Sequence, residues 1–307
     1  MRFNKLDLNL LVVLNALLTE RSISRAAAKI HLSQPATSNA LARLRDYFGD
    51  ELLVSSGRQL LLTSRAESLI EPVREVLMRI DSTIATQPEF DPALETRSFT
   101  LLASDFTTTI LIPPLLESLF QAAPGVRIHM RSVTYQAGEM LEQGKADFLI
   151  APSQFLSKNH PSSTLFEEEY VCVTWSRHTH VREQLTLNDY LSCGHVTLNL
   201  SAGQQGSAFD SWFIDSFDVK RRIEVTAPTM AALPALVIGT DRIATVHRRV
   251  AEQASTYLPV TIWEPPLKIP HLVQMLQWHK YKSNDPATTW MRERLTEVAE
   301  RIWAYTS

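Results

Sequence analysis

The stretch from Ser22 to Glu51, SISRAAAKIHLSQPATSNALARLRDYFGDE, constrains the fold of this chain more than any other segment. Its pattern predicts a short helix, a sharp turn at HLSQP and a second helix that follows the turn. Ser33 suits the N-cap of that helix because its hydroxyl can accept a hydrogen bond from a free first-turn amide. Pro35 suits the first turn because its missing N–H has no intrahelical partner to lose.

The two sides of the second helix differ in chemistry. Small and apolar residues lie on the side expected to face a core: Ala36, Ala40, Leu41 and Leu44. Donor-rich side chains lie on the other side: Gln34, Thr37, Ser38, Asn39 and Arg43. Such side chains on the N-terminal half of a helix suit contacts with base edges and phosphates in a DNA groove. An ordinary helical hairpin with a solvated face is the alternative, because this pattern also occurs without DNA binding.

The neighbouring segments favour the DNA-binding interpretation. Upstream leucines recur at helical spacing and predict a third helix: Leu10, Leu11, Leu14, Leu17 and Leu18. Downstream, ELLVSSGRQLLL at 51–62 predicts a two-stranded wing whose polar, basic tip contains Arg58. The residues expected to contact DNA are Ser24, Arg25, Ser33, Gln34, Pro35, Thr37, Ser38, Asn39, Arg43 and Arg58.

The segment from Leu6 to Glu67 resembles the winged helix-turn-helix of LysR-type transcriptional regulators, notably in AAAKIHLSQPATSNALARLRDYFGDELL and LTSRAE. Further segments extend the resemblance over nearly the whole chain: DLNLLVVLNALLTERS, SDFTT, GHV, KRRIEV, GTDRIAT and SNDPATTWMRE. They are most similar to the branch of the nodulation-protein-D activators and the regulators of naphthalene and nitrotoluene degradation. The chain departs from the family pattern twice. His247 replaces the branch's usual proline, and Ser55 replaces a frequent wing arginine, whose phosphate contact Arg58 would supply.

Composition and charge agree with a DNA-binding head on a larger globular body. Apolar residues make up 45% of the chain, enough for a real core. The net charge is −3, yet residues 1–65 are basic and the remainder is acidic, so only the head is expected to meet nucleic acid. No apolar stretch approaches the ~20 residues that span a bilayer, and no signal-peptide cleavage site follows the first apolar run. We therefore expect a cytoplasmic protein without membrane contact.

Neither the cysteines nor the known catalytic motifs point to an enzyme or a cofactor. Cys172 and Cys193 lack metal-ligand spacing and are expected to be reduced thiols, with a redox switch as the alternative. The chain contains no G-x-S-x-G, Walker loop, G-x-G-x-x-G or H-E-x-x-H motif. A regulator is therefore predicted, with neither metal nor cofactor. The alternatives are an α/β enzyme or solute-binding protein with a helix-turn-helix head.

A long amphipathic helix is predicted after the wing, capped by Thr63 or Ser64, ending near Thr86 and about 35 Å long. Pro72 predicts a local bend. One apolar stripe on a helix between two domains predicts a dimer contact, through Leu69, Val73, Val76, Leu77 and Ile80. Packing of the stripe against the chain's own body is the alternative.

The body after the linker at 87–96 alternates predicted strands and helices, which favours an α/β fold with mostly parallel sheets. The resemblance implies more: a body like the two-lobed type 2 periplasmic binding proteins. It then gives a winged helix-turn-helix domain at 1–65, a linker helix at 64–87 and an effector domain at 92–307. Its first lobe would hold 92–164 and 269–307, and its second lobe 165–268.

The effector site is expected where strands end and helices begin. The Ser104–Thr109 turn offers hydroxyls and free amides that could hold an oxygen of an aromatic or carboxylate inducer. Asp105 argues against a bare anion beside it, unless its side chain points away or caps the helix that begins there. The residues expected to line the site are Ser104, Asp105, Phe106, Thr107, Thr108, His195, Thr226, Thr229, Met230 and Trp278. A plain capping loop, a structural His195 and a core Trp278 are the alternatives.

These features predict a sequence-specific transcriptional regulator controlled by a small molecule. The expected partners are double-stranded promoter DNA, the inducer and a second copy of the chain. The resemblance adds a tetramer of two dimers, and contact with RNA polymerase.

Overall fold

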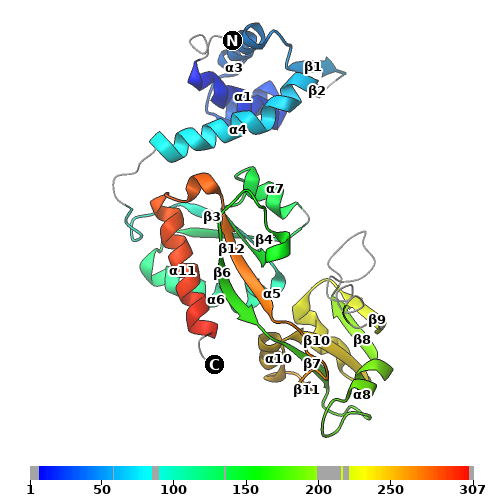
Figure 1. Ribbon diagram of the computed structural model, residues 1–307. Helices are drawn as coiled ribbons and strands as arrows, with labels where there is room; N and C mark the ends of the chain where they lie inside the picture. The colour runs from blue at the N-terminus through cyan, green and yellow to red at the C-terminus, as the bar shows by residue number, and fades with distance from the viewer. Residues whose placement is uncertain are drawn as a thin grey trace. The chain divides into compact units, whose positions relative to one another are not determined.

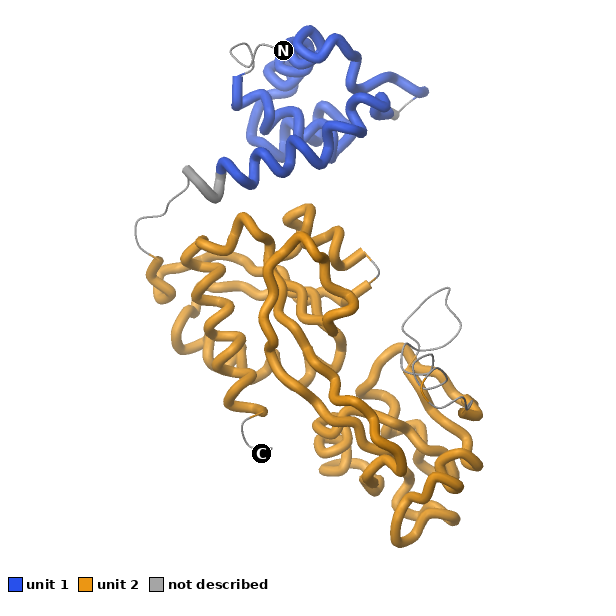
Figure 2. Tube along the Cα trace, in the orientation of Figure 1, with its two compact units in different colours: residues 1–88 blue, residues 89–307 orange. Residues whose placement is uncertain are grey.

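The computed structural model describes residues 7–57, 59–84, 90–134, 136–198, 216 and 221–303. It divides into two compact units, Met1–Pro88 and Glu89–Ser307 (Figure 2). The predicted DNA contact Arg58 lies outside the described residues. So does the helix predicted near 208–217, except for its residue 216.

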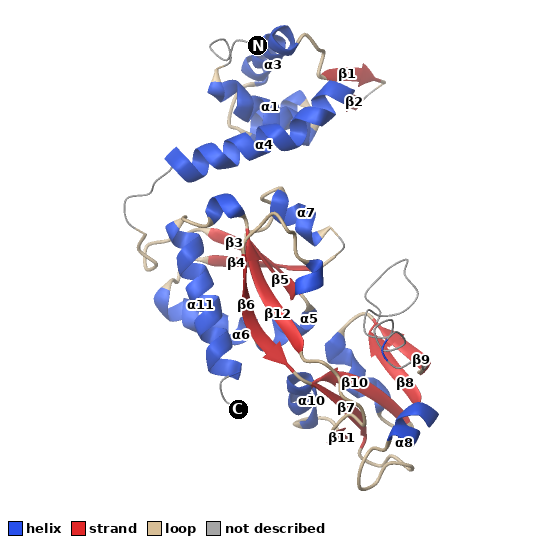
Figure 3. Ribbon diagram, viewed as in Figure 1, coloured by secondary structure: helices blue, strands red, loops and turns tan. Residues whose placement is uncertain are grey.

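The first unit is a helical domain with a two-stranded wing (Figure 3). Its elements are α1 Leu8–Glu20, α2 Ile23–Lys29, α3 Gln34–Phe48, β1 Leu53–Ser56, β2 Gln59–Leu62 and α4 Ser64–Ile84. Leu14 of α1 and Leu44 of α3 are fully buried at 0% exposure in one shared core. The third helix and the wing predicted from the sequence are therefore confirmed.

Helix α4 packs against the core of its own unit. Its Ala66 and Val73 belong to the same buried cluster as the α1 leucines, and Leu69 and Leu77 pack against that cluster. The expectation that the whole stripe lacks an intrachain partner is therefore wrong. An apolar stripe shows that a helix is covered, but it does not identify the covering surface. Two predicted dimer residues lie outside that cluster: Val76, which is 43% exposed, and Ile80, which is half-buried.

The second unit has two lobes, here called the first and the second lobe (Figure 1). Each is built on a five-stranded sheet. In spatial order the first sheet is β4 Arg127–Ser132, β3 Ser98–Ala103, β5 Phe148–Pro152, β12 Leu272–Trp278 and β6 Ser162–Glu168. Its helices are α5 Asp105–Ile110, α6 Ile112–Ala122, α7 Ala137–Glu142 and α11 Pro286–Trp303. The chain thus completes the first sheet with a strand that returns more than a hundred residues later.

The second lobe is built from the segment between those two parts. Its sheet is β11 Val260–Trp263, β7 Tyr170–Trp175, β10 Arg242–His247, β8 Gly194–Leu198 and β9 Arg222–Ala227. Its helices are α8 Leu187–Ser192, η3 Met230–Val237 and α10 Arg248–Ser255. η3 is a 3₁₀ helix with Pro234 inside it, at the place where the sequence predicts a helix.

Both sheets are mixed rather than mostly parallel, which corrects the sequence-based expectation. In the first, β3 is parallel to β4 and β5, whereas β12 is antiparallel to β5 and β6. In the second, β8 is parallel to β9 and β10, whereas β7 is antiparallel to β10 and β11. The antiparallel strands adjoin the two crossings between lobes. Antiparallel pairing needs no helical crossover, so the strand–helix alternation gives no sign of it.

One apolar cluster joins the two lobes. It includes Phe106 and Phe166 from the first lobe and Val171 and Val246 from the second. The junction is therefore a packed region of a single unit. Among the described residues, no helix is both long enough and apolar enough to cross a bilayer.

Candidate functional site

The N-terminus of α3 has the predicted cap. The Ser33 hydroxyl accepts a hydrogen bond from the amide of Ala36 at 3.3 Å, and a proline occupies the first turn. Gln34, Ser38 and Asn39 are exposed on the helix that follows. The cap fixes the start of the helix, so these three side chains are held on a rigid element rather than on a loop.

Two positions on α3 differ from the prediction. Thr37 is buried at 0% exposure and its Oγ1 donates to the carbonyl of Ser33 at 3.1 Å. Ala36, expected in the core, is exposed. A threonine hydroxyl can bond the carbonyl four residues back, which draws the side chain against the helix. Thr37 therefore holds the first turn and is not on the exposed polar face.

Basic side chains flank this face. Arg25 of α2 lies 3.7 Å from the Glu20 carboxylate with its side chain 68% exposed. Arg43 of α3 lies 3.8 Å from Asp7 with its side chain 60% exposed. Such exposed ion pairs contribute little stability, so exchanging them for a phosphate costs little. Ser24 and Pro35 are exposed as well.

The wing is anchored by residues that the sequence reading missed. Arg45 near the end of α3 donates to the carbonyls of Glu51 and Leu53, at 2.8 and 2.9 Å. Asp50 accepts from the amide of Leu52 at 2.7 Å and the hydroxyl of Thr63 at 2.6 Å. The Thr63 hydrogen bond, then the Leu52 amide, lower the pKa of Asp50. The arginine shortly before Asp50-Glu51 was the only available signal for this anchor.

At the end of β3, the Ser104 turn is a real N-cap. The Ser104 hydroxyl accepts from the amide of Thr107 at 3.2 Å, and Thr107 is buried at 0% exposure. The Thr108 hydroxyl donates to the Ser104 carbonyl at 2.8 Å. Much of the hydroxyl chemistry of this turn is therefore used locally, as the capping-loop alternative expects.

Asp105 reaches across to the second lobe. Its Oδ2 accepts a hydrogen bond from the amide of Ala231 at 3.0 Å, in the first turn of η3. The carboxylate thus caps a helix on the other lobe, and not the helix that begins at its own turn. The contact brings the Ser104 turn close to Thr229 and Met230, two of the predicted site residues. Thr226 lies on β9, close before them in the chain.

His195 and Trp278 do not lie beside the Ser104 turn and the start of η3. His195 is fully buried beside Tyr190, its Nε2 2.6 Å from the Tyr190 carbonyl and its ring stacked edge-on at 4.6 Å. It pairs with Ile243 of the Tyr190 cluster, whereas the next residue, Val196, belongs to the junction cluster. Since successive side chains alternate across a sheet, His195 faces away from η3.

Trp278 stands at the wrong end of its strand for the predicted role. It pairs with Phe148, which pairs with Leu101, so it lies about three residue rows, or roughly 10 Å, from Ser104 along the sheet. The crossing between lobes adjoins the other end of β12, near Leu272. The Arg292 guanidinium lies over the Trp278 ring at 4.1 Å. Trp278 ends its strand as predicted, but the expectation that this end lies near the hinge is wrong. The ring belongs to the core, as the alternative expects.

His247, the last residue of β10, is a junction residue that no sequence motif assigned to the site. It is 5% exposed, with its ring 4.4 Å from Phe106 and 4.8 Å from Tyr170. Burial lowers the pKa of His247 to about 3, so the imidazole is neutral. Its Nδ1 is buried without a hydrogen-bond partner within the described residues. Leaving such a group unsatisfied costs about 1–3 kcal/mol.

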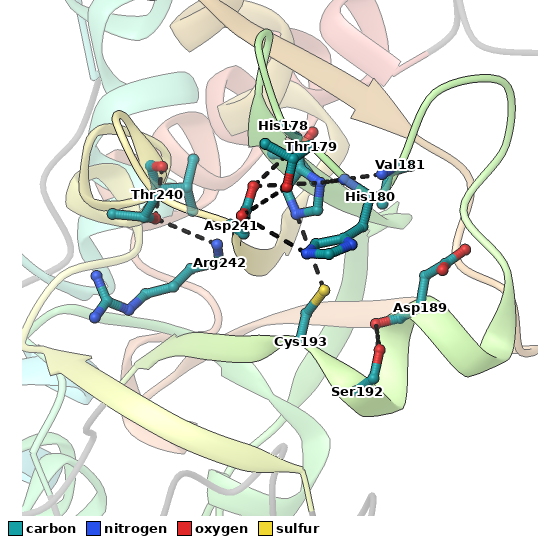
Figure 4. Close-up of polar contacts among 12 residues, drawn as sticks. His178, Thr179, His180, Val181, Asp189, Ser192, Cys193, Thr240, Asp241 and Arg242 are labelled. Atoms are coloured by element: carbon teal, nitrogen blue, oxygen red, sulfur yellow. Dashed lines mark hydrogen bonds and ion pairs between the residues drawn. The ribbon is translucent and has the colours of Figure 1, made fainter.

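A second polar group gathers Cys193, His178 and Asp241, far apart in the sequence (Figure 4). Cys193 Sγ lies 3.9 Å from His178 Nε2, and His178 Nδ1 lies 3.9 Å from Asp241. However, Nδ1 accepts from the amides of His180 and Val181 at 3.2 and 3.1 Å, so the ring proton is on Nε2. An imidazole protonated there cannot remove a thiol proton.

The group therefore is not a nucleophilic triad. Burial raises the pKa of the Cys193 thiol, and it raises that of Cys172 to about 12. Asp241 instead holds a turn, accepting from the amide and hydroxyl of Thr179 at 2.9 and 2.7 Å. Within the described ranges no set of three side chains is arranged to bind a metal.

Comparison with known proteins assigns both units. Residues 8–67 match the family described as bacterial regulatory helix-turn-helix protein, lysR family, and residues 92–300 match the LysR substrate binding domain. Nodulation protein D from Bradyrhizobium sp. (strain ANU 289) is 42% identical over 302 residues, covering 98% of this chain and 89% of that protein.

Two solved structures have a similar fold. A probable transcriptional regulator from Pseudomonas aeruginosa has a TM-score of 0.65 at 30% identity, covering 96% of this chain and 97% of that one. Full-length CbnR, solved with its target DNA, has a TM-score of 0.53 at 16% identity, covering 96% of this chain and 100% of that one, and is similar in fold.

Proposed function

The chain belongs to the LysR family of DNA-binding transcriptional regulators, and we propose that α3 reads its promoter while the lobe junction of the second unit binds its inducer. The observation that carries the DNA-binding part is the capped N-terminus of α3, with Gln34, Ser38 and Asn39 exposed on a rigid helix. Ser24, Arg25 and Arg43 would contact phosphates beside it, together with Arg58 of the wing. The family is one of transcriptional regulators and not of enzymes.

The test is a mobility shift of promoter-sized DNA with the full chain and two variants. Gln34→Ala is expected to cost about 1–3 kcal/mol of binding and to relax base preference, because an amide can form a bidentate contact with a base. Ser68→Ala, which removes an exposed hydroxyl of α4, is the matched control and should bind as the wild type does. Equal base discrimination in Gln34→Ala and the wild type would remove Gln34 from the reading role.

We also infer that the regulator acts as a dimer or a tetramer of two dimers. Val76 and Val12 are 43% and 45% exposed on the first unit, and Ile80 of α4 is half-buried. On α6 of the second unit, Leu116 and Phe120 are 47% and 81% exposed one helical turn apart. These apolar side chains suit contacts between copies. A dimer presents two recognition helices, so its operator should have two-fold symmetry.

Light scattering at micromolar concentration checks the assembly. The wild type should have the mass of a dimer or larger, and Val76→Asp combined with Phe120→Asp should lower it. A monomeric wild type would defeat the inference. Bound beside a promoter, the dimer would also contact RNA polymerase, which a two-hybrid assay with polymerase subunits can test.

The inducer would bind among the Ser104 turn, Asp105, Thr229 and Met230, and would favour one relative arrangement of the lobes. Ligand and DNA must then change each other's affinity by the same factor. A thermal-shift screen of aromatic acids, phenols, flavonoids and acyl metabolites identifies the class. A ligand at a hundred times its Kd raises stability by about 2.7 kcal/mol, which the method detects.

A further inference from the structure

Three strand ends of the second unit meet at the lobe junction. Strand β3 runs into Asp105 and Phe106, β9 leads to η3, and β10 ends at His247. The Asp105–Ala231 hydrogen bond joins the first two at 3.0 Å, and the Phe106–His247 contact joins the first and third at 4.4 Å. In open α/β sheets, ligands bind outside the carboxyl ends of strands. His247 therefore stands where this unit is expected to receive its inducer.

Each of the other buried histidines of the described chain has at least one ring nitrogen within hydrogen-bond distance of a polar atom, and for His160 this is the Lys280 amide at 3.4 Å. His195 contacts the Tyr190 carbonyl at 2.6 Å, His178 accepts from two amides, and His279 accepts from the amide of Tyr281 at 3.2 Å. The His247 ring contacts the aromatic rings of Phe106 and Tyr170, but its buried Nδ1 has no hydrogen-bond partner within the described residues. A buried polar atom left unsatisfied in a native protein calls for an explanation, and a ligand is one.

The surroundings also indicate which ligand group would fit. A neutral imidazole offers one N–H donor and one nitrogen acceptor, and no charge. The residue before Phe106 is Asp105, whose carboxylate adds a negative charge to the junction and so disfavours an anion there. Phe106 and Tyr170 flank the imidazole with aromatic rings, which pack well against another aromatic ring.

We propose that His247 is a specificity-determining residue of the inducer site, where a ring nitrogen hydrogen-bonds a hydroxyl or carbonyl oxygen of an uncharged aromatic inducer. The proposal rests on the proposed inducer-binding function. It adds a residue and a ligand group that the Ser104 turn alone does not define. An inducer without such an oxygen, or one with a carboxylate in its place, is then rejected at this position.

The experiment uses the full chain with three matched probes: 4-hydroxyacetophenone, ethylbenzene and 4-hydroxybenzoate. Calorimetry should show that the wild type binds 4-hydroxyacetophenone at least tenfold more tightly than the other two. His247→Leu should lose that preference, whereas His247→Asn, which keeps a donor and an acceptor, should stay within threefold of the wild type. His180→Leu, at an exposed histidine of the same lobe, is the control and should behave as the wild type.

A readout without ligand separates a binding role from a structural one. His247→Leu removes an unsatisfied polar atom from an apolar place, so its melting temperature should equal or exceed that of the wild type. A lower melting temperature with unchanged probe affinities would assign His247 a structural role and overturn the proposal. Failure of the wild type to prefer 4-hydroxyacetophenone would overturn it as well.

Failure of the proposed function has a different signature. If the wild type shifts promoter DNA and another compound alters that shift, the regulator still has an inducer and only the His247 assignment fails. If no compound of the broader screen changes either DNA binding or stability, the inducer-binding function itself fails.

Discussion

The two units of this protein differ in how far apart in the sequence their contacting residues lie. In the first unit, α1, α2 and α3 follow one another directly and share one leucine-rich core. In the second, β12 at 272–278 pairs with β5 at 148–152 and with β6 at 162–168. Local contacts leave their pattern in neighbouring residues, whereas distant ones do not. Short sequence motifs therefore predict the structure of the first unit, but they do not predict the strand pairing of the second.

The largest expected effect tests whether the units are also separate in stability. Leu44→Ala removes a fully buried side chain from the first core and should destabilise that unit by about 2–5 kcal/mol. Leu101→Ala is its counterpart in the second core, where Leu101 is also at 0% exposure. Calorimetry should show one transition lowered by each variant and the other left in place. A single unfolding transition that both variants shift would show that the two units unfold together.

The second prediction uses pH to separate the units. Burial lowers the pKa of His247 to about 3 and that of His279 to about 4, both in the second unit. Between these values and the ordinary 6.5, the unfolded chain binds protons that the native unit does not. Stability of this unit should therefore fall as the pH falls from 6.5 towards 4, by up to about 1.4 kcal/mol per pH unit for each histidine.

Glu168 acts in the opposite sense, because burial raises the pKa of its carboxyl and its native form keeps a proton longer. Melting curves between pH 7 and 5 should show a net loss for the second unit and a smaller change for the first. His247→Leu should flatten the dependence, and the exposed His271→Leu should not. Equal slopes for both units would contradict this account.

The sequence predicted the first unit well because its signals are local. The Ser33 cap, the α3 leucines and the wing all follow from neighbouring residues. The errors in the prediction of this unit concern which group or surface a side chain contacts. Thr37 bonds its own helix instead of facing outward, and much of the α4 stripe packs on α1 instead of only on another copy. A helical pattern shows which side is apolar, but not which of two apolar surfaces covers it.

In the second unit, most strands and helices were predictable from the sequence, but their neighbours in space were not. The sequence did not predict the strands β6 and β11, and it placed the Trp278 end of β12 near the hinge, which adjoins the other end of that strand. Asp105 caps a helix more than a hundred residues away. His247 stood out only as a departure from the proline of the family pattern. Its position among three strand ends depends on long-range pairing, which a single sequence does not reveal.

A third prediction concerns the anchor of the wing. Arg45→Met removes two hydrogen bonds from a charged donor to the carbonyls of Glu51 and Leu53, and should cost about 1.5–3 kcal/mol. Limited proteolysis should then cut the wing faster, and DNA affinity should fall. Arg43→Met is the control for stability, since among the residues that the structure describes Arg43 makes a single exposed ion pair, at 3.8 Å. Comparable loss of stability in both variants would show that the Arg45 hydrogen bonds do not anchor the wing.

The smallest expected effect compares one chemical feature in both units. Ser33 and Ser104 each cap a helix, accepting from the amides of Ala36 and Thr107 at 3.3 and 3.2 Å. Replacing either by alanine should cost about 1 kcal/mol, measured by urea unfolding of the matching unit. The functional consequences should differ. Ser33→Ala loosens the start of the reading helix and should weaken DNA binding without changing probe affinity, whereas Ser104→Ala should do the reverse.

If Ser104→Ala alone also weakened DNA binding in the absence of any ligand, the lobe junction would influence the reading helix even when it is empty. The separation of the two units in stability would then not extend to function. Asp105→Asn offers the sharper version of this comparison, because it keeps the shape of the side chain and removes the charge that accepts from Ala231. If both variants bind DNA with the affinity of the wild type, the empty junction does not influence the first unit.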